Sequence, residues 1–588
     1  MIKKRLTAFL TGTVLLMGGA VPAFAQFDNK NETPASPIVV IADDGETVLL
    51  GVREDAGTAD GGLIPANLGL LLTGEGDGLS GSSDGTAEAQ EGVISDNEPD
   101  RVGAADLPSS WRTPLLPPAE NQGIYSTCWA FAAMKCSEVN LLMNGFGEGT
   151  DLSELQLIYS IFFGEGDTWE PSYGSWFNAK GNYVMATSAL ARHYGAADGA
   201  VYPYNVSFSF SESDRTADIA AIDHVIWPGT WPKTKSEWKS DVWQAKNQVI
   251  KELIFEYGAV SVSFNQEGTY NSDLNCYYTG WPAYSDEKPS ANHAVTLVGW
   301  DDGKETEEGA GAFLALNSWG EDWGENGLFW ISYSDASLAD PAAYVMEARE
   351  PGVMRDNTVF SYTGVGYSQT ARSTRATRGA NVFTAEHETV LDRVGFYLPA
   401  GASYTARVLT NPADPADPSS GTEAAAVSGT VQYGGFYKAD LPEYVTVSPG
   451  ESFAVELTIM AEDRNCVLFE TRNRSGAAMV CHEGESFYYN GTSWADSEYG
   501  VVIGGNTYYL GNIPIYAYGI GEGMEAVPCD ADTDGRAGLA DLLAVLRNMR
   551  SPGSLTNYGY YAADMNRSGS VDGEDASLIA GFLIKEIR

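Results

Sequence analysis

The stretch "QGIYSTCWAF", residues 122–131, decides how the chain is interpreted, because of the cysteine at its centre. Cys128 opens the run "CWAFAAMKCSEVNLLM" (residues 128–143), whose apolar residues recur at helical spacing until an Asn-Gly pair ends the pattern. We expect a helix there, with Ser126 or Thr127 as its capping residue. Free backbone amides in the first helical turn favour a thiolate, so Cys128 is either a reactive thiol with a lowered pKa or a buried small hydrophobic residue.

The composition limits the classes of protein to which the chain can belong. Its 588 residues are too many for one hydrophobic core, so several domains are expected. The 79 acidic and 35 basic residues give a formal net charge of −44, and such a surface repels phosphate backbones and anionic lipids. This balance argues against nucleic-acid binding and against a membrane-surface role. Six cysteines are too few for a disulfide framework.

The N-terminus has the pattern of a secretory signal peptide. Basic residues at 3–5 precede an apolar run at 6–21, and small residues at 23–25 suit cleavage after Ala25. We therefore expect export and a secreted, extracellular or cell-surface location. No later stretch is long and apolar enough to span a bilayer. Residues 26–106 are rich in Gly, Asp, Glu and Ser, as in an acidic pro-segment or linker with much disorder.

Three stretches with different residue patterns follow this segment, and they predict three domains. Residues 107–350 mix helix-like and strand-like patterns with many aromatic residues, which indicates an α+β domain. From 351 to 525 the chain alternates short β-patterned runs with Gly, Pro and Asn turns, and this pattern predicts a β-sandwich. Residues 528–588 hold an internal repeat and form a third, small unit.

Three further residues complete a candidate nucleophilic site around Cys128. His293 stands at the start of the strand-like run "NHAVTLVGW", and an imidazole is the base that a cysteine nucleophile needs. Asn317 offers an amide oxygen that can hold the imidazole in one tautomer. Gln122 precedes Cys128 closely enough for its amide to join the Cys128 backbone N–H in an oxyanion hole. Each residue alone has an ordinary structural interpretation, whereas the combination indicates nucleophilic catalysis.

Several stretches that contain these residues resemble the papain-like cysteine peptidases, in family order. They are "LPSSWR", "NQGIYSTCWAF", "YPYN", "NHAVTLVGWDD" and "NSWGEDWGENGLFWISY". The resemblance implies a nucleophile, a general base that later acts as acid, an imidazole orienter and an oxyanion donor: Cys128, His293, Asn317 and Gln122, respectively. It also implies that Trp319 shields the hydrogen bond between the imidazole and the amide from water.

The chain departs from the family pattern in its cysteines. The family usually has Cys-Gly-Ser before the nucleophile, whereas Tyr-Ser-Thr stands here, so the usual disulfide cannot form. Whether Cys136 and Cys276 pair instead is left open by the sequence, and Cys466 and Cys481 are candidates to bridge neighbouring strands. The acidic insertion "DDGKETEEGAG" at 301–311 is consistent with an exposed hairpin.

The terminal repeat carries oxygen-bearing residues at alternate positions around a glycine. This is the EF-hand spacing, which brings hard oxygen ligands together on Ca²⁺. The candidate ligands are Asp530, Asp532, Asp534, Arg536 and Asp541 in the first loop, and Asp564, Asn566, Ser568, Ser570, Asp572 and Asp575 in the second. Arg536 and Ser570 would bind through backbone carbonyls. The alternative is a pair of solvated acidic turns, but the repetition, with an amphipathic run after each loop, favours two calcium sites.

The repeat, with Asp as the closing ligand of each loop, resembles a dockerin module. That resemblance implies a cohesin module of a scaffoldin as partner, as in cellulosomes. At the usual recognition positions stand Leu539-Ala540 and Gly573-Glu574, which leaves the partner class open. The middle domain resembles the lectin-like β-sandwich of some secreted bacterial peptidases of this family, and it either binds carbohydrate or has a packing or spacer role.

The sequence thus predicts a multi-domain protein: an α+β papain-like peptidase, a β-sandwich and a small α calcium-binding dockerin. The predicted function is a secreted cysteine endopeptidase that acts on protein or peptide substrates and is attached to a cohesin-bearing complex. No organic cofactor is expected. The alternative is a non-catalytic carbohydrate-binding or adhesion subunit of the same complex. Cleavage preference and physiological substrate do not follow from the sequence.

Overall fold

The computed structural model describes part of the chain. Described are residues 38–41, 47–50 and 107–586, the last without 147–148, 163–179, 206–217, 349–357, 365, 367–368, 374–376, 462–464, 471–480, 500, 504–505, 509–510, 522–528, 533–536, 551–553, 556–558, 560–561 and 566–570. The predicted signal peptide and most of the predicted pro-segment lie outside these residues. Within the pro-segment, β1 (Ile38–Ile41) pairs antiparallel with β2 (Thr47–Leu50).

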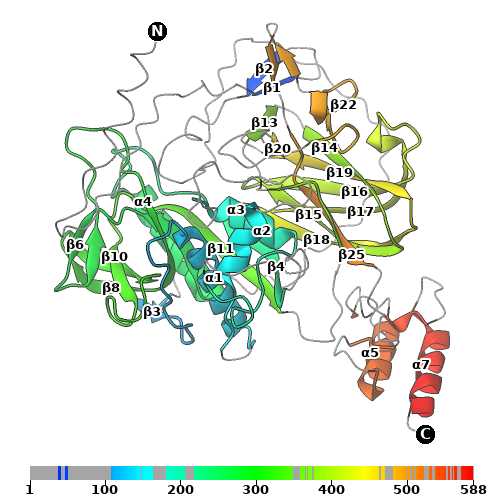
Figure 1. Cartoon of the computed structure of the whole chain (residues 1–588), viewed down its shortest axis with the longest axis horizontal. Helices are drawn as coiled ribbons and strands as arrows, with labels where there is room; N and C mark the ends of the chain where they lie inside the picture. Colours follow the sequence, from blue (N-terminus) through cyan, green and yellow to red (C-terminus); the bar gives the residue numbers. More distant parts are fainter. Residues whose placement is uncertain are drawn as a thin grey trace, which may run out of the picture. The chain divides into compact units, whose positions relative to one another are not determined.

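The first domain is built around one central helix, α1 (Cys128–Met143) (Figure 1). Every residue from Trp129 to Leu142 is buried, so α1 packs on all its faces rather than on one stripe. It ends at Asn144, followed by Gly145 with a φ of 83°, as the sequence predicts. The cap differs from the prediction. Thr127 stands at the N-cap position but makes no capping bond, because its hydroxyl lies 2.7 Å from the Tyr204 hydroxyl.

Two short helices and a sheet pack against α1, and a longer helix packs against the sheet. The short helices are α2 (Glu154–Phe162) and α3 (Tyr183–Ala191), and the longer one is α4 (Asp241–Tyr257). The strands are β3 (Ser110–Arg112), β4 (Ala220–Trp227), β5 (Val260–Phe264), β6 (Thr269–Asn271), β7 (Cys276–Tyr278), β8 (His293–Thr306), β9 (Gly309–Leu316), β10 (Leu328–Ser332) and β11 (Ala339–Ala348). The antiparallel pair β8–β9 forms the predicted acidic hairpin.

The middle domain is a β-sandwich, as the sequence predicts. Its strands are β12 (Thr358–Phe360), β13 (Gln369–Ser373), β14 (Thr377–Thr384), β15 (Thr389–Leu398), β16 (Ser403–Thr410), β17 (Thr422–Thr430), β18 (Gly434–Val447), β19 (Ser452–Met460), β20 (Asn465–Phe469), β21 (Ser486–Tyr489), β22 (Trp494–Asp496), β23 (Val501–Ile503), β24 (Asn506–Tyr508) and β25 (Ile515–Ile520). One sheet has the order β17-β16-β19-β14-β21-β22, and the facing strands are β12-β25-β15-β18. Alternate residues of both layers, such as Phe396 and Val455, form the core between them.

The two domains share a sheet and a core. Strand β18 of the sandwich pairs antiparallel with β4 of the first domain, from Gly434↔Trp227 to Tyr437↔His224. The ladder thereby continues from β12 at one end to β6 at the other. One hydrophobic cluster contains residues of both domains, and the Trp227 and Tyr397 rings stack at 5.4 Å. The sandwich is therefore packed into the first domain rather than tethered beside it.

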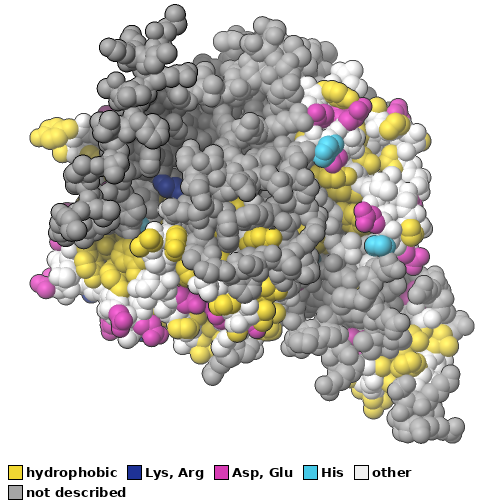
Figure 2. All heavy atoms as spheres, in the orientation of Figure 1, with side chains coloured by type: hydrophobic (Ala, Val, Ile, Leu, Met, Phe, Trp, Pro, Cys, Tyr) yellow, Lys and Arg dark blue, Asp and Glu magenta, His cyan; other side chains and the backbone are white. Residues whose placement is uncertain are grey.

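The C-terminal segment has a small core of its own. Helices α5 (Leu539–Arg550) and α7 (Gly573–Glu586) pack around Val545 and Ile579, both fully buried. In the part of the chain that the structure describes, no helix has the length and apolar character needed to cross a membrane. The described surface seen in Figure 2 shows scattered Asp and Glu side chains and few Lys or Arg, in keeping with the acidic composition.

Candidate active site

Cys128 is the first residue of α1, and its sulfur lies beside the backbone of Ala294, the residue that follows His293. The backbone of Ala294 hydrogen-bonds the sulfur, which brings the start of α1 to the start of β8. Burial raises the pKa of the Cys128 thiol, while hydrogen bonds from the backbone, Ala294 first, and the charge of Lys180 act in the opposite direction. The position of Cys128 at the start of a helix predicts a lowered pKa for its thiol. That expectation is wrong for the resting site, because loss of water outweighs the helix amides.

His293 is buried, and its ring is held on three sides. The ring Nε2 lies 2.8 Å from Asn317 Oδ1, the ring stacks on Trp319 at 4.9 Å, and the Phe264 ring approaches it at 5.8 Å. Burial lowers the pKa of His293 to about 4, against the opposing effect of the Asn317 hydrogen bond. The imidazole is therefore neutral near pH 7. Since Asn317 Oδ1 can only accept hydrogen bonds, the ring proton of neutral His293 resides on Nε2. The lone pair on Nδ1 is then available to accept a proton from another group.

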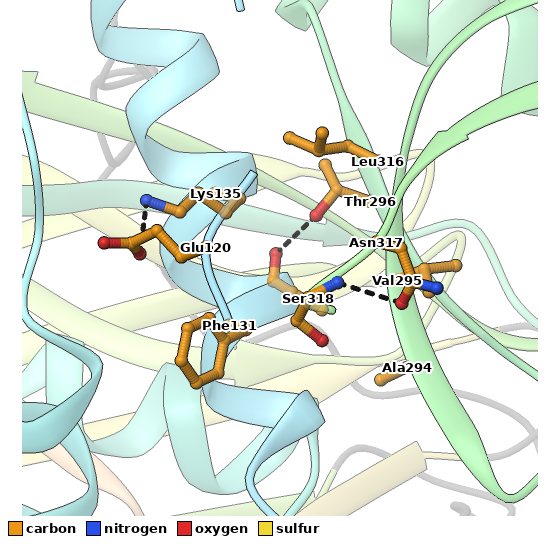
Figure 3. A pocket seen from close by; sticks show the side chains of 10 residues that line it. Glu120, Phe131, Lys135, Ala294, Val295, Thr296, Leu316, Asn317 and Ser318 are labelled. Carbon is orange, nitrogen blue, oxygen red and sulfur yellow. Dashed lines mark hydrogen bonds and ion pairs between the residues drawn. The ribbon is translucent and has the colours of Figure 1, made fainter. Parts of the chain in front are cut away.

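Asn317 follows β9 directly and has its orientation fixed by two donors. Its Oδ1 also accepts the backbone N–H of Ser318 at 2.9 Å (Figure 3). The amide therefore cannot turn without losing this bond and the one to His293. The structure thus brings His293, Asn317 and Trp319 together as the resemblance implied. Their catalytic roles remain predictions.

Gln122 lies beside this group, on a segment that pairs with the chain after Asn317. Its backbone N–H donates to Ser318 O at 2.9 Å, and its Oε1 accepts from the Ser318 hydroxyl at 2.5 Å. Its Nε2 donates one proton to Tyr125 O at 2.7 Å, which leaves the second N–H for another acceptor. The side chain is 7% exposed. Gln122 is therefore a fixed donor rather than a mobile surface amide.

Sequence reasoning missed two residues that hold this arrangement. Ser318 directly follows Asn317, and its hydroxyl fixes the Gln122 amide. Tyr204 lies in the stretch "YPYN", and its hydroxyl donates to Gln122 O at 3.1 Å while it also contacts the Thr127 hydroxyl. The sequence signal for Ser318 was its place beside the imidazole orienter. The sequence signal for Tyr204 was its place in one of the stretches that resemble the family.

Comparison with known proteins agrees with this geometry. The family model described as "Papain family cysteine protease" matches residues 107–346. Zingipain-2 from Zingiber officinale is 27% identical over 226 residues, which cover 38% of this chain and 86% of that protein. P34 probable thiol protease from Glycine max is 26% identical over 273 residues, with 45% of this chain and 64% of that protein covered.

The chain contains a papain-family cysteine peptidase domain. Its enzyme class is accordingly that of a hydrolase. The family model "Lectin like domain" matches residues 359–518, so the β-sandwich is a lectin-like domain. A solved structure of the cysteine protease and lectin-like domains of Cwp84, a surface layer associated protein of Clostridium difficile, is 23% identical. It aligns with a TM-score of 0.55 over 71% of this chain and 89% of that one, and so shares the fold.

Five of the cysteines have free thiols in the structure. Cys136 and Cys276 in the peptidase domain are both buried and free, so the pairing that the sequence left open is not made. Cys481 likewise forms no disulfide, and its sulfur lies 3.3 Å from the Ser497 hydroxyl. The suggested bridge between Cys466 and Cys481 is therefore wrong. The reason is that Cys481 precedes β21, whereas Cys466 lies in β20, which pairs with β13.

The candidate calcium ligands are described in part. Asp534, Arg536, Asn566, Ser568 and Ser570 lie outside the described residues. In the first loop, one carboxylate oxygen from each of Asp530, Asp532 and Asp541 lies within 4.8 Å of the others. Three carboxylates this close repel one another unless a cation lies among them, and hard oxygen donors of this kind suit Ca²⁺. The residues present therefore fit a divalent ion.

The closing aspartates of the two loops each accept two backbone N–H groups. Asp541 accepts the backbone N–H groups of Asp532 at 3.0 Å and Gly538 at 2.5 Å. Asp575 accepts those of Met565 at 2.9 Å and Asp572 at 2.9 Å. The bonds from Gly538 and Asp572 are equivalent in the repeat, whereas those from Asp532 and Met565 differ by one loop position. The described part of the second loop, which includes Asp564, gives no such carboxylate cluster.

Proposed function

We propose that the chain is a secreted cysteine endopeptidase in which Cys128, His293, Asn317 and Gln122 carry out peptide hydrolysis. The observation that carries this proposal is the buried His293–Asn317 hydrogen bond of 2.8 Å, located where β8 meets the N-terminus of α1. A neutral thiol and a neutral imidazole stand at the site, so catalysis begins with proton transfer from Sγ to Nδ1. The two charges arise together, and each offsets the desolvation of the other.

The thiolate then attacks the carbonyl carbon of the scissile peptide bond. The negative charge that develops on the carbonyl oxygen is held by the Cys128 backbone N–H and the remaining Nε2 proton of Gln122. The His293 imidazolium gives its proton to the leaving amine as the C–N bond breaks, which leaves a thioester on Cys128. Water attacks the thioester with His293 as base, the carboxylic acid departs and the thiol is restored.

The C-terminal segment is proposed to be a dockerin that binds two Ca²⁺ ions and attaches the enzyme to a cohesin-bearing extracellular complex. The carboxylate cluster of the first loop supports this proposal, as do the closing aspartates of both loops, each of which accepts two backbone N–H groups. The lectin-like domain is proposed to bind carbohydrate. A secreted or cell-surface location is in keeping with the signal-like N-terminus and with the surface-layer association of the structurally similar Cwp84.

The second candidate function is a non-catalytic carbohydrate-binding or adhesion subunit of the same complex, favoured only by the lectin-like domain. A fluorogenic peptide assay separates the two. The wild-type chain should hydrolyse the peptide, and Cys128→Ser should abolish hydrolysis, because an alcohol is not deprotonated by imidazole near neutrality as a thiol is. Equal turnover by both proteins would reject Cys128 as nucleophile, and no turnover by either would favour the binding subunit.

A further inference from the structure

Lys135 is a buried cation in the middle of the peptidase domain. It lies on α1, about two turns after Cys128, and is 5% exposed. Its ammonium lies 2.8 Å from Glu138 Oε2 and 2.8 Å from Glu120 Oε2. Two more carboxylates, those of Asp151 and Glu154, lie at 3.6 and 3.9 Å. We call these five residues the Lys135 cluster.

The cluster contains more acids than one lysine can neutralise. Burial acts to lower the pKa of Lys135, but the charges of Glu138, Glu154 and Glu120 overcome that effect and raise it. Burial in turn raises the pKa values of Glu138 and Glu154, so these acids retain protons more readily than free glutamate does. The lysine therefore stays charged and is hydrogen-bonded to both carboxylate oxygens of Glu138.

Glu120 connects the cluster to the active site. Its backbone carbonyl accepts Gly320 N–H at 2.8 Å, and two residues later Gln122 N–H donates to Ser318 O at 2.9 Å. Residues 120–122 thus pair with the chain that follows Asn317. In Figure 3, Lys135 and Glu120 line one side of a small hollow, and Asn317 and Ser318 line the other.

Resting on the proposed function, we propose that Lys135 is a positioning residue for peptide hydrolysis. Through its ion pair with Glu120 it fixes segment 120–122, which carries the oxyanion donor Gln122, against α1, which carries Cys128. Without the cation, the Glu120 side chain, already 31% exposed, turns toward solvent and the segment loses its anchor on α1. The thiol–imidazole pair depends on α1, β8 and Asn317, so it stays assembled. A misplacement of about 1 Å in such a donor can cost roughly a hundredfold in rate.

A double-mutant cycle on kcat tests this proposal with the full chain and a fluorogenic peptide. Gln122→Ala should lower kcat by about 10²–10³-fold, as loss of an oxyanion donor does. Lys135→Met should lower kcat by roughly 10–100-fold with KM changed less than about threefold. In the Gln122→Ala background, Lys135→Met should have almost no further effect, because the group that it positions is already absent. Multiplicative losses would overturn the proposal.

Two further variants keep the result interpretable. Glu120→Gln removes the charge that Lys135 holds while Glu138 stays in place, and it should reproduce the non-additivity with Gln122→Ala even if Lys135→Met folds poorly. The control is Lys251→Met, which breaks the ion pair of another largely buried lysine, to the exposed Asp302 at 2.6 Å, and should leave kcat unchanged. A loss of kcat in the control equal to that of Lys135→Met would contradict a specific role.

The same experiment separates failure of this inference from failure of the proposed function. Alkylation of Cys128 by iodoacetamide should proceed within about threefold of the wild-type rate in Lys135→Met, since it needs the thiol–imidazole pair but no oxyanion donor. An alkylation rate that falls as far as kcat would overturn the positioning role. A wild-type chain without hydrolysis would instead overturn the proposed function, and this inference with it.

Discussion

Substitution of Gly435 tests whether the peptidase and lectin-like domains are one folding unit. Gly435 lies in β18, where this strand pairs with β4 of the peptidase domain at Gly435↔Ile226. A Cβ at this position would lie 1.9 Å from Val225 O and 3.0 Å from Val225 C, both backbone atoms. Neither atom can move away as a flexible side chain would. Gly435→Ala must therefore push β18 and β4 apart.

The expected cost follows from the contacts at the joint. The two strands are paired over four residues, and parting them by about 1 Å weakens at least two ladder hydrogen bonds worth roughly 0.5–1.5 kcal/mol each. Distortion of the fully buried Phe436 next to it adds strain, for a total of about 2–4 kcal/mol. For so large a unit, we expect the unfolding temperature to fall by roughly 4–10 °C.

Scanning calorimetry of the full chain measures this effect. Because one hydrophobic cluster includes residues of both domains, the peptidase and lectin-like transitions should shift together in Gly435→Ala. The control is Gly303→Ala, on the exposed β8–β9 hairpin, where the nearest atom to a new Cβ is a side-chain oxygen of Asp301 at 3.3 Å. It should leave the transition nearly unchanged. Two separate transitions, of which only one responds to Gly435→Ala, would refute the shared folding unit.

Three further predictions concern the site and the C-terminal segment. Asn317→Ala removes the acceptor of the His293 Nε2 proton and should lower kcat by about a hundredfold, less than His293→Ala; equal losses would reject the orienting role. Burial holds the pKa of His293 at about 4, below its ordinary value of 6.5, so the unfolded chain binds this proton more tightly. The stability that neutral His293 contributes should thus be complete above pH 6.5 and be lost as the pH falls toward 4, and the difference in Tm between wild type and His293→Gln should change over that range only. Asp541→Asn removes charge from the three-carboxylate cluster and should weaken Ca²⁺ binding of the first loop at least tenfold by calorimetry, whereas Asp496→Asn in the lectin-like domain should not.

What the sequence predicted best was local. The helix that starts at Cys128, the strand that starts at His293 and the hairpin at 301–311 follow from apolar periodicity and turn residues, which act within a few positions along the chain. The helical run was predicted with the correct end at Asn144. The site residues could be proposed because few kinds of functional site combine a thiol, an imidazole and two amides, and nucleophilic catalysis is one of them.

What the sequence could not predict depends on contacts between distant residues. The pairing of β4 with β18 joins residues about two hundred positions apart, and no local pattern encodes such a partner. Burial of Lys135 is visible only once α1 is known to be covered on all faces, since lysine in a helix is usually exposed. The pKa of Cys128 was predicted in the wrong direction for a similar reason: the helix amides are local, but the loss of water comes from the whole fold.

The central claim is that Cys128 is the nucleophile, and stoichiometric labelling tests it most directly. The full chain is titrated with an alkylating peptidyl inhibitor, the modified residue is located by mass spectrometry, and residual peptide hydrolysis is measured at each step. The titration uses a Cys466→Ser background, in which the remaining thiols besides Cys128, those of Cys136, Cys276, Cys481 and Cys529, are all buried. One label per chain should therefore enter, at Cys128, and hydrolysis should fall in proportion to it. Hydrolysis that continues undiminished when Cys128 is fully labelled would contradict the account.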